Sequence, residues 1–169
     1  KPNGDICDEN FELFCSKAWT GMLVTIKMAF VATLIGFFFA IPLASLSANN
    51  MAPLPIAIPA RVLLAGLRSL PSIIWALLFA IALGFGPLPG ILAMTLYTIG
   101  YLGKLQYEAM EGVHNAPLES GMAMGLTHSE KLFHVVIPES SNHLLSQLLF
   151  MFEYNVRHGA VLGLVGAGG

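Results

Sequence analysis

The charged residues closest to the C-terminus have the best spacing for binding a substrate. Glu153 and Arg157 lie four residues apart within a long apolar segment, so they share one face if that segment is helical. Charges in such surroundings are costly and are usually paired or functional. The Arg157 guanidinium could receive an oxyanion, with Asn155 as a nearby hydrogen-bonding group. Alternatively, the two charges neutralise each other and fix the helix in its bundle.

Acidic residues and histidines at helical spacing raise the question of a metal site. Glu111-x-x-His114 has the pattern of half a di-iron site, which requires a second Glu-x-x-His from a facing helix. The sequence contains no second copy, so we predict no metal site. A glycine-rich phosphate loop followed by Lys-Ser or Lys-Thr is also missing, so we expect no ATP chemistry and no cofactor on this chain.

Composition decides the class of protein that must position these residues. The chain has 169 residues, of which 56% are hydrophobic and only 11% charged, and its mean hydropathy is +0.72. Such a chain has too little polar surface to cover a water-soluble globule and too much apolar content for disorder. The formal net charge of -2 leaves no basic face for nucleic acid. We therefore expect a membrane protein.

About four apolar stretches are long enough to cross a bilayer as helices. A span needs roughly 20 apolar residues, and the stretches cover residues 19–47, 56–84, 91–110 and 138–165. Lys27 and Pro42 interrupt the first stretch. The second is expected to be kinked or broken at Pro71, which lacks a backbone donor. The predicted fold is all-α, a polytopic helical bundle with one transmembrane domain over residues 18–169.

The ends of the chain and the loops suggest an orientation. Residues 1–17 form an acidic polar leader, whereas Arg61, Arg68 and Lys104 mark the loops that should remain in the cytoplasm. The leader would then face the outside. There Cys7 and Cys15 could form a disulfide, although two unlinked thiols fit the sequence equally well.

The long polar stretch at residues 114–137 contains strong local signals. Pro117 suits the start of a short helix, and Gly125 should end it. Thr127 and Glu130 then have the spacing of a capping box, and Pro138 can open the last span. The result is an elbow of two short helices with apolar side chains. Another protein could grip this elbow, or its apolar residues could lie at the bilayer interface.

This stretch resembles the EAA loop of ABC importer permeases. The similarity rests on Glu119-Ser120-Gly121, on Gly125 three residues later, and on Val135-Val136-Ile137-Pro138 after nine more. Two departures are the Ser-Gly pair after the glutamate, where Ala-Ala is usual, and Val and Ile in place of Ile and Leu. The first should weaken the short helix, and the second nearly conserves volume.

The resemblance covers about residues 19–169 and is most similar to the permease subunit of phosphonate importers. The segments that carry it are residues 71–79, 84–87, 103–109, 152–157 and 161–169. The sequence at His158-Gly159-Ala160 departs from the small, hydroxyl-bearing residues expected there. In that family a further span follows the last glycines, so we expect the given sequence to be truncated at its C-terminus.

The resemblance implies a subunit of an ATP-driven importer for phosphonate or a related phosphorus oxyanion in the inner membrane. Its implied partners are cytoplasmic ATPases, an external solute-binding protein, membrane lipid and a second permease chain, expected to be another copy. The elbow would dock the ATPase, and the pair near the C-terminus would line the substrate path. The implied coupling residues are Glu119, Gly121, Gly125, Leu126, Glu130 and Pro138, and the implied path residues are Glu153, Asn155 and Arg157.

Three alternatives stay open at this point. A permease for another small solute, such as an amino acid, would keep the mechanism and change the cargo. A membrane-embedded metalloenzyme would use the Glu and His residues near the third span. An ATPase-independent channel or carrier would transport without nucleotide.

Overall fold

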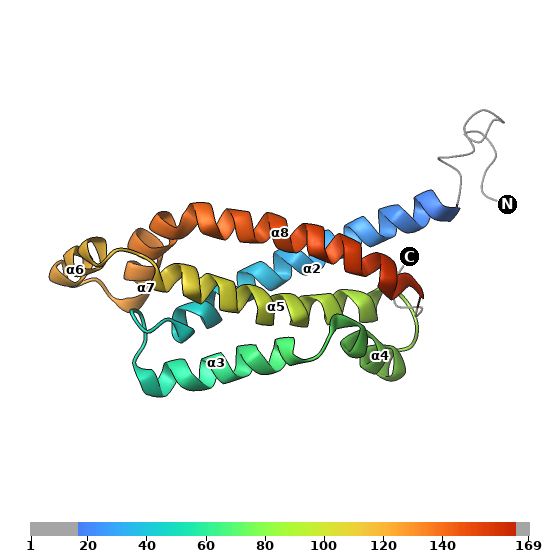
Figure 1. Cartoon of the computed structure of the whole chain (residues 1–169), viewed down its shortest axis with the longest axis horizontal. Coiled ribbons are helices and arrows are strands. Elements are labelled where there is room, and N and C mark those ends of the chain that lie inside the picture. Colours follow the sequence, from blue (N-terminus) through green and yellow to red (C-terminus); the bar gives the residue numbers. More distant parts are fainter. Residues whose placement is uncertain (1–16, 165–169) are drawn as a thin grey trace, which may run out of the picture.

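The chain folds as a bundle of helices, as Figure 1 shows. The computed structural model describes residues 17–164, and this part contains no β-strand. The fold class predicted from the sequence is therefore confirmed. Cys7 and Cys15 lie outside the described residues. The elements are α2 (Lys17–Ser47), α3 (Leu54–Ser69), α4 (Ser72–Leu83), α5 (Pro87–Glu111), α6 (Asn115–Ala123), α7 (His128–Lys131), the π-helical segment η1 (Leu132–Val136) and α8 (Ile137–Leu164).

Helix α5 lies at the centre of the bundle. It packs against α2 and α8 and also against α3 and α4, and Figure 1 shows α2, α5 and α8 extending along the long axis. The buried side chains between them are mostly small or flexible, such as Ala32, Ala40, Met94 and Met151. Small residues let helix backbones approach closely, which is how helices associate where lipid supplies no hydrophobic driving force.

The second apolar stretch is broken at Pro71, as predicted. Leu70 has extended backbone angles at the end of α3, which is the conformation that a following proline favours. Helices α3 and α4 are bent relative to each other by 80°. The bend leaves the first backbone N–H groups of α4 without a side-chain cap.

Fewer helices meet the length and hydropathy required of a membrane span than the four stretches predicted from the sequence. Among residues 17–164, one helix is long and apolar enough to cross a membrane, and a second span is counted if the bent pair α3–α4 is taken together. Helices α5 and α8 fall outside this count. Both contain many polar or small residues that face other helices, among them Thr98, Gly100 and Asn155, and these lower their apolar content.

Three boundaries differ from the sequence-based expectation. Helix α2 continues through Pro42 without a break. The third span begins at Pro87, earlier than expected, because the turn is confined to residues 84–86, where Gly84 and Gly86 have positive φ angles. The segment before Pro138 is π-helical, and the N–H of Ile137 donates to the carbonyl of Leu132. Pro138 lacks the N–H that a regular α-helix would need there.

Candidate functional site

The elbow over residues 114–137 is built around a glycine corner. Gly125 has a φ of 74°, a conformation that other residues adopt only with strain. Its N–H donates to the Met122 carbonyl at 3.0 Å, and the N–H of Leu126 donates to the Gly121 carbonyl at 3.2 Å. These two bonds form a Schellman motif. The end of α6 and the direction of the chain after it are thus fixed locally.

The predicted capping box at the start of α7 is confirmed. The backbone N–H of Thr127 donates to Glu130 Oε2 at 2.9 Å, and the Thr127 hydroxyl donates to the same oxygen at 2.7 Å. The N–H of Glu130 donates back to the Thr127 hydroxyl at 3.4 Å. The hydrogen bonds from Thr127 lower the pKa of the exposed Glu130 carboxyl. The carboxylate therefore stabilises the elbow in its charged form.

One side of the elbow packs onto the helix bundle. A Cβ added to Gly121 would lie 3.4 Å from both Leu126 and Val135, so α6 sits closely on the π-helical segment. Leu132 of the elbow is buried in a core cluster. The other members of that cluster are Ala44, Ala48, Met51, Met110, Val113, Leu118 and Val136.

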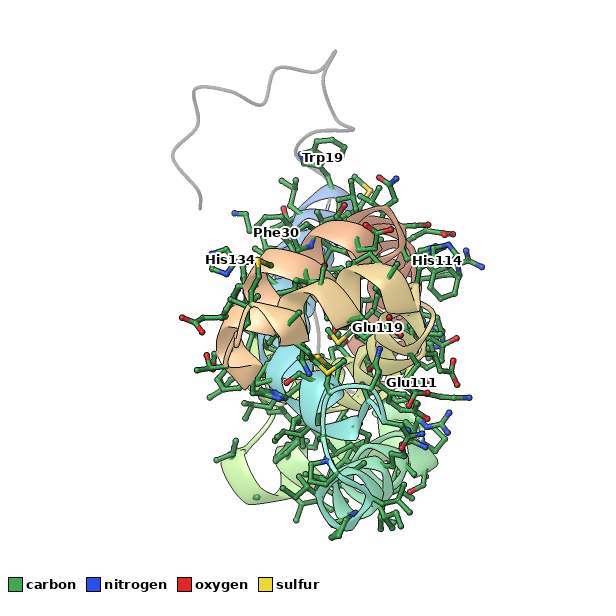
Figure 2. The ribbon with its side chains drawn as sticks, turned by 90° about the vertical axis from the view of Figure 1, so that its left-hand side faces the viewer. Trp19, Phe30, Glu111, His114, Glu119 and His134 are labelled. Atoms are coloured by element: carbon green, nitrogen blue, oxygen red, sulfur yellow. The ribbon has the colours of Figure 1, made fainter. Side chains whose placement is uncertain are left out.

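The other side of the elbow is apolar and open. The side chains of Met122, Met124 and Phe133 have exposed fractions of 57%, 69% and 62%. Glu119 is exposed as well. Figure 2 shows Glu119 at this end of the molecule, between His114 and His134. We call the exposed surface of Glu119, Met122, Met124 and Phe133 the elbow face.

Sequence reasoning missed a set of hydrogen bonds at the elbow end of the bundle, which connect the elbow to the α2–α3 connection and Arg61 of α3 to the ends of α2 and α5. His128 Nδ1 lies 3.1 Å from the Met51 carbonyl oxygen. Arg61 pairs with Glu111 at 2.5 Å and also donates to the Ser47 carbonyl at 2.8 Å. Glu111 further accepts from the backbone N–H of Asn49 at 2.7 Å. These partners lie 14 to 77 residues apart in the sequence, so no spacing rule could have joined them.

The Glu111-x-x-His114 pattern is divided in the structure. The Glu111 carboxylate is engaged by Arg61, while His114 lines a pocket of about 440 Å³ between α5 and α8. Figure 2 shows both residues at the elbow end of the molecule. Within residues 17–164, His, Cys, Asp and Glu side chains do not gather in groups of three or more that could hold a metal.

The residues predicted for the substrate path do not come together. Asn155 is 1% exposed and donates to Thr33 Oγ1 and Thr98 Oγ1, both at 2.9 Å. It therefore connects α8 to α2 and α5. Glu153 and Arg157 form an ion pair on an exposed face of α8, with side-chain exposures of 61% and 72%. Asn155 is thus a core residue, separated from the charged pair.

Comparison with known proteins shows the family to which the chain belongs. A family described as "binding-protein-dependent transport system inner membrane component" matches residues 40–169. The chain belongs to this family. The resemblance to a permease family is thus confirmed, and the matched residues include the end of α2, the elbow and all the later helices.

Individual members of this permease family are similar to most of the chain. The phosphite transport system permease protein PtxC of Stutzerimonas stutzeri is 40% identical over 155 residues, which are 90% of this chain and 56% of that protein. The phosphate-import permease protein PhnE of Mycolicibacterium smegmatis is 37% identical over 161 residues, which are 95% of this chain and 30% of that protein. The chain thus spans about half or less of these two relatives.

Solved structures support the fold of the permease family. The methionine ABC transporter MetNI, in inward facing conformations, is similar with a TM-score of 0.82 at 21% identity. That similarity covers 96% of this chain and 79% of the solved chain. The bent pair α3–α4 and the long helices α2, α5 and α8 thus belong to a known permease architecture.

Proposed function

We propose that the chain is part of the membrane permease of an ATP-driven importer for phosphite, phosphonate or a related phosphorus oxyanion. Relatives described as phosphite or phosphate permeases are 36–40% identical over 86–95% of the chain. Relatives described as arginine and glutamine permeases are 29% and 25% identical. An amino-acid cargo is the second candidate, and it has weaker support.

The elbow face is the observation that carries the transport mechanism. A Schellman corner and a capping box fix two short helices that expose Met122, Met124 and Phe133. Exposed apolar groups ringed by polar ones are typical of protein contact surfaces. We assign this surface to a cytoplasmic ATPase, on which ATP hydrolysis would take place.

Each residue implied by the EAA resemblance would then have its own role in transmitting motion. Glu119 lies on the elbow face, Gly121 and Leu126 pack α6 onto the bundle, and Gly125 makes the corner. Glu130 caps α7, and Pro138 starts α8. Movement of the ATPase pair would pull the elbow and tilt the attached helices, which alternates access from the two sides.

The membrane arrangement follows from the same proposal. Helices α2, α5, α8 and the bent pair α3–α4 cross the inner membrane, so the protein is multi-pass. Large apolar side chains on their outer faces, such as Phe38 and Ile81 at 66% and 84% exposure, would meet lipid or a second permease chain. An external solute-binding protein would deliver substrate on the face opposite the elbow.

Site-specific crosslinking tests the docking assignment. In the full-length permease co-expressed with its ATPase, Met124→Cys should crosslink to the ATPase. Ile81→Cys is the matched control, since its side chain is also exposed but lies near the far end of α4. Crosslinking at Ile81→Cys alone, or at neither position, would contradict the assignment.

Transport in proteoliposomes tests the cargo. The full permease, reconstituted with its ATPase and binding protein, should accumulate phosphite or a phosphonate only when ATP is supplied. Uptake without ATP would identify a channel or secondary carrier. Uptake of arginine or glutamine, with no uptake of oxyanion, would establish the second candidate.

A further inference from the structure

A cavity of about 440 Å³ lies where the α3–α4 bend faces α5 and α8, and the transport mechanism described above does not use it. Its walls combine polar groups from four helices with three apolar side chains. The lining residues are Arg68, Ser69, Pro71, Ser72, Ile73, Tyr97, Tyr154, His158 and Val161. Figure 1 places the bend away from the elbow end of the bundle.

The electrostatics of this cavity favour an anion. Arg68 forms no ion pair with the carboxylates of residues 17–164, so its charge is available to a ligand. Helix α4 starts at the cavity wall without a side-chain cap, and the N-terminus of a helix attracts negative charge. Carboxylates are missing from the described lining, in contrast to the pocket beside the elbow, which contains Glu108 and Glu139.

Hydrogen-bond donors surround the same space. The Ser72 side chain is 5% exposed and has no hydrogen-bond partner among the described residues. Tyr97 accepts a bond from the Tyr154 hydroxyl at 3.2 Å, so its own hydroxyl proton stays available. His158 Nδ1 lies 3.0 Å from the Tyr154 carbonyl oxygen, so that nitrogen carries the proton of a neutral ring and Nε2 is left as an acceptor for a ligand hydroxyl.

Close helix packing fixes the position of the cationic group. A Cβ added to Gly100 of α5 would lie 2.9 Å from the backbone nitrogen of Arg68 and 3.0 Å from the Leu64 carbonyl oxygen. Glycine therefore lets α3 approach α5 directly beside the cavity. The rings of Tyr97 and Tyr154 stack with centroids 5.6 Å apart, and Tyr154 stacks on His158 at 3.7 Å. Their polar atoms are held in place before a ligand arrives.

We propose that this cavity is the oxyanion site of the permease, in which Arg68 and the start of α4 neutralise a tetrahedral phosphorus oxyanion. The Ser72 and Tyr97 hydroxyls donate to its oxygens, and His158 Nε2 accepts from the oxygen that carries a proton in the monoprotonated oxyanion. The proposal rests on the proposed function and names the residues that recognise the cargo. An amino acid fits poorly, because its ammonium group would require a carboxylate that the described lining does not supply.

Uptake measurements in proteoliposomes that hold the full permease, its ATPase and its binding protein test this site. Arg68→Gln should raise the KM for phosphite about ten- to a hundredfold, the effect expected for losing a charge-assisted hydrogen bond. Lys104→Gln is the matched control, since it removes one positive charge from a helix of the same bundle outside this cavity.

The outcomes separate this proposal from the function on which it rests. If the wild-type complex takes up no oxyanion, the proposed function fails. If the wild type transports phosphite and Arg68→Gln transports it with an unchanged KM, the site proposal alone is overturned. If Arg68→Gln fails to assemble, Tyr97→Phe is the deciding variant, because it keeps the stacked ring and removes the hydroxyl that donates to the ligand and accepts from Tyr154. A KM raised several-fold supports the site, and an unchanged KM overturns it.

Discussion

His128 of the elbow is linked directly to Met51 in the connection between α2 and α3. The ring nitrogen Nδ1 lies 3.1 Å from the Met51 carbonyl oxygen, and the Met51 side chain is buried beneath the elbow with Leu118 and Leu132. Arg61 and Glu111 fasten the same end of the bundle. Movement of the elbow must therefore reach α2 and α3 as well as α8.

Replacing His128 should weaken this link. His128→Ala removes one hydrogen bond, worth about 1 kcal/mol, and should lower the oxyanion transported per ATP hydrolysed roughly fivefold. His128→Asn, which keeps a donor close to the Nδ1 position, should retain most of the coupling. Equal coupling in the two variants would show that the contact transmits no motion.

A bulky residue at the glycine corner should uncouple the transporter. Gly125 has a φ of 74°, so Gly125→Val costs more than the roughly 1–2 kcal/mol typical of an L-residue in this conformation. We expect normal membrane insertion and ATP hydrolysis with little transport. Gly66→Ala is the control, since an added Cβ there meets no atom within 4 Å. Full coupling in Gly125→Val would show that the corner does not transmit motion.

The capping box predicts a pH dependence of elbow stability. The pKa of Glu130 is lowered from its ordinary 4.5 by hydrogen bonds from Thr127. A lowered pKa means that the charged form stabilises the fold at higher pH, and that this stability is lost as pH falls through the lowered value. The protection factors of residues 127–131 against hydrogen exchange should therefore fall below pH 4.5 in the wild type. In Glu130→Gln, protection should be lower already at neutral pH and should lack this acidic transition.

Asn155 should matter for stability rather than for recognition. Asn155→Ala breaks hydrogen bonds to Thr33 and Thr98 in a buried site and should lower the free energy of unfolding by about 1–3 kcal/mol. Asn142→Ala, on an exposed position of α8, should change it little. Thermal unfolding in detergent measures both variants. If Asn155→Ala were as stable as Asn142→Ala, the hydrogen bonds of Asn155 would not be what holds the three helices together.

The role of Arg157 in recognising substrate stays a prediction from the sequence. Arg157→Lys keeps the charge and removes the planar fork. Because Lys can still pair with Glu153 and the pair lies outside the cavity at the α3–α4 bend, we expect normal assembly and an unchanged KM for phosphite. A raised KM for phosphite in this variant would instead support the predicted role of Arg157 in the substrate path.

Local sequence determined the features that depend on a few neighbouring residues. The break at Pro71, the corner at Gly125 and the Thr127–Glu130 capping box follow from a missing donor, a positive φ angle and a three-residue spacing. Such features need no distant partner. The elbow was therefore predictable nearly to the residue, and its length and spacing carried the family resemblance.

Tertiary packing decided which side chains face each other. Asn155 and Arg157 are two residues apart, and a helix turns about 200° over that distance, but only the positions of α2 and α5 determine that Asn155 is the inward residue. The contacts Arg61–Glu111 and Asn155–Thr33 join residues 50 and 122 positions apart. Arg68 faces Tyr97 and His158 across the cavity for the same reason. Sequence spacing fixes direction within one helix, whereas the rotation of one helix against another is set by how all their side chains pack together.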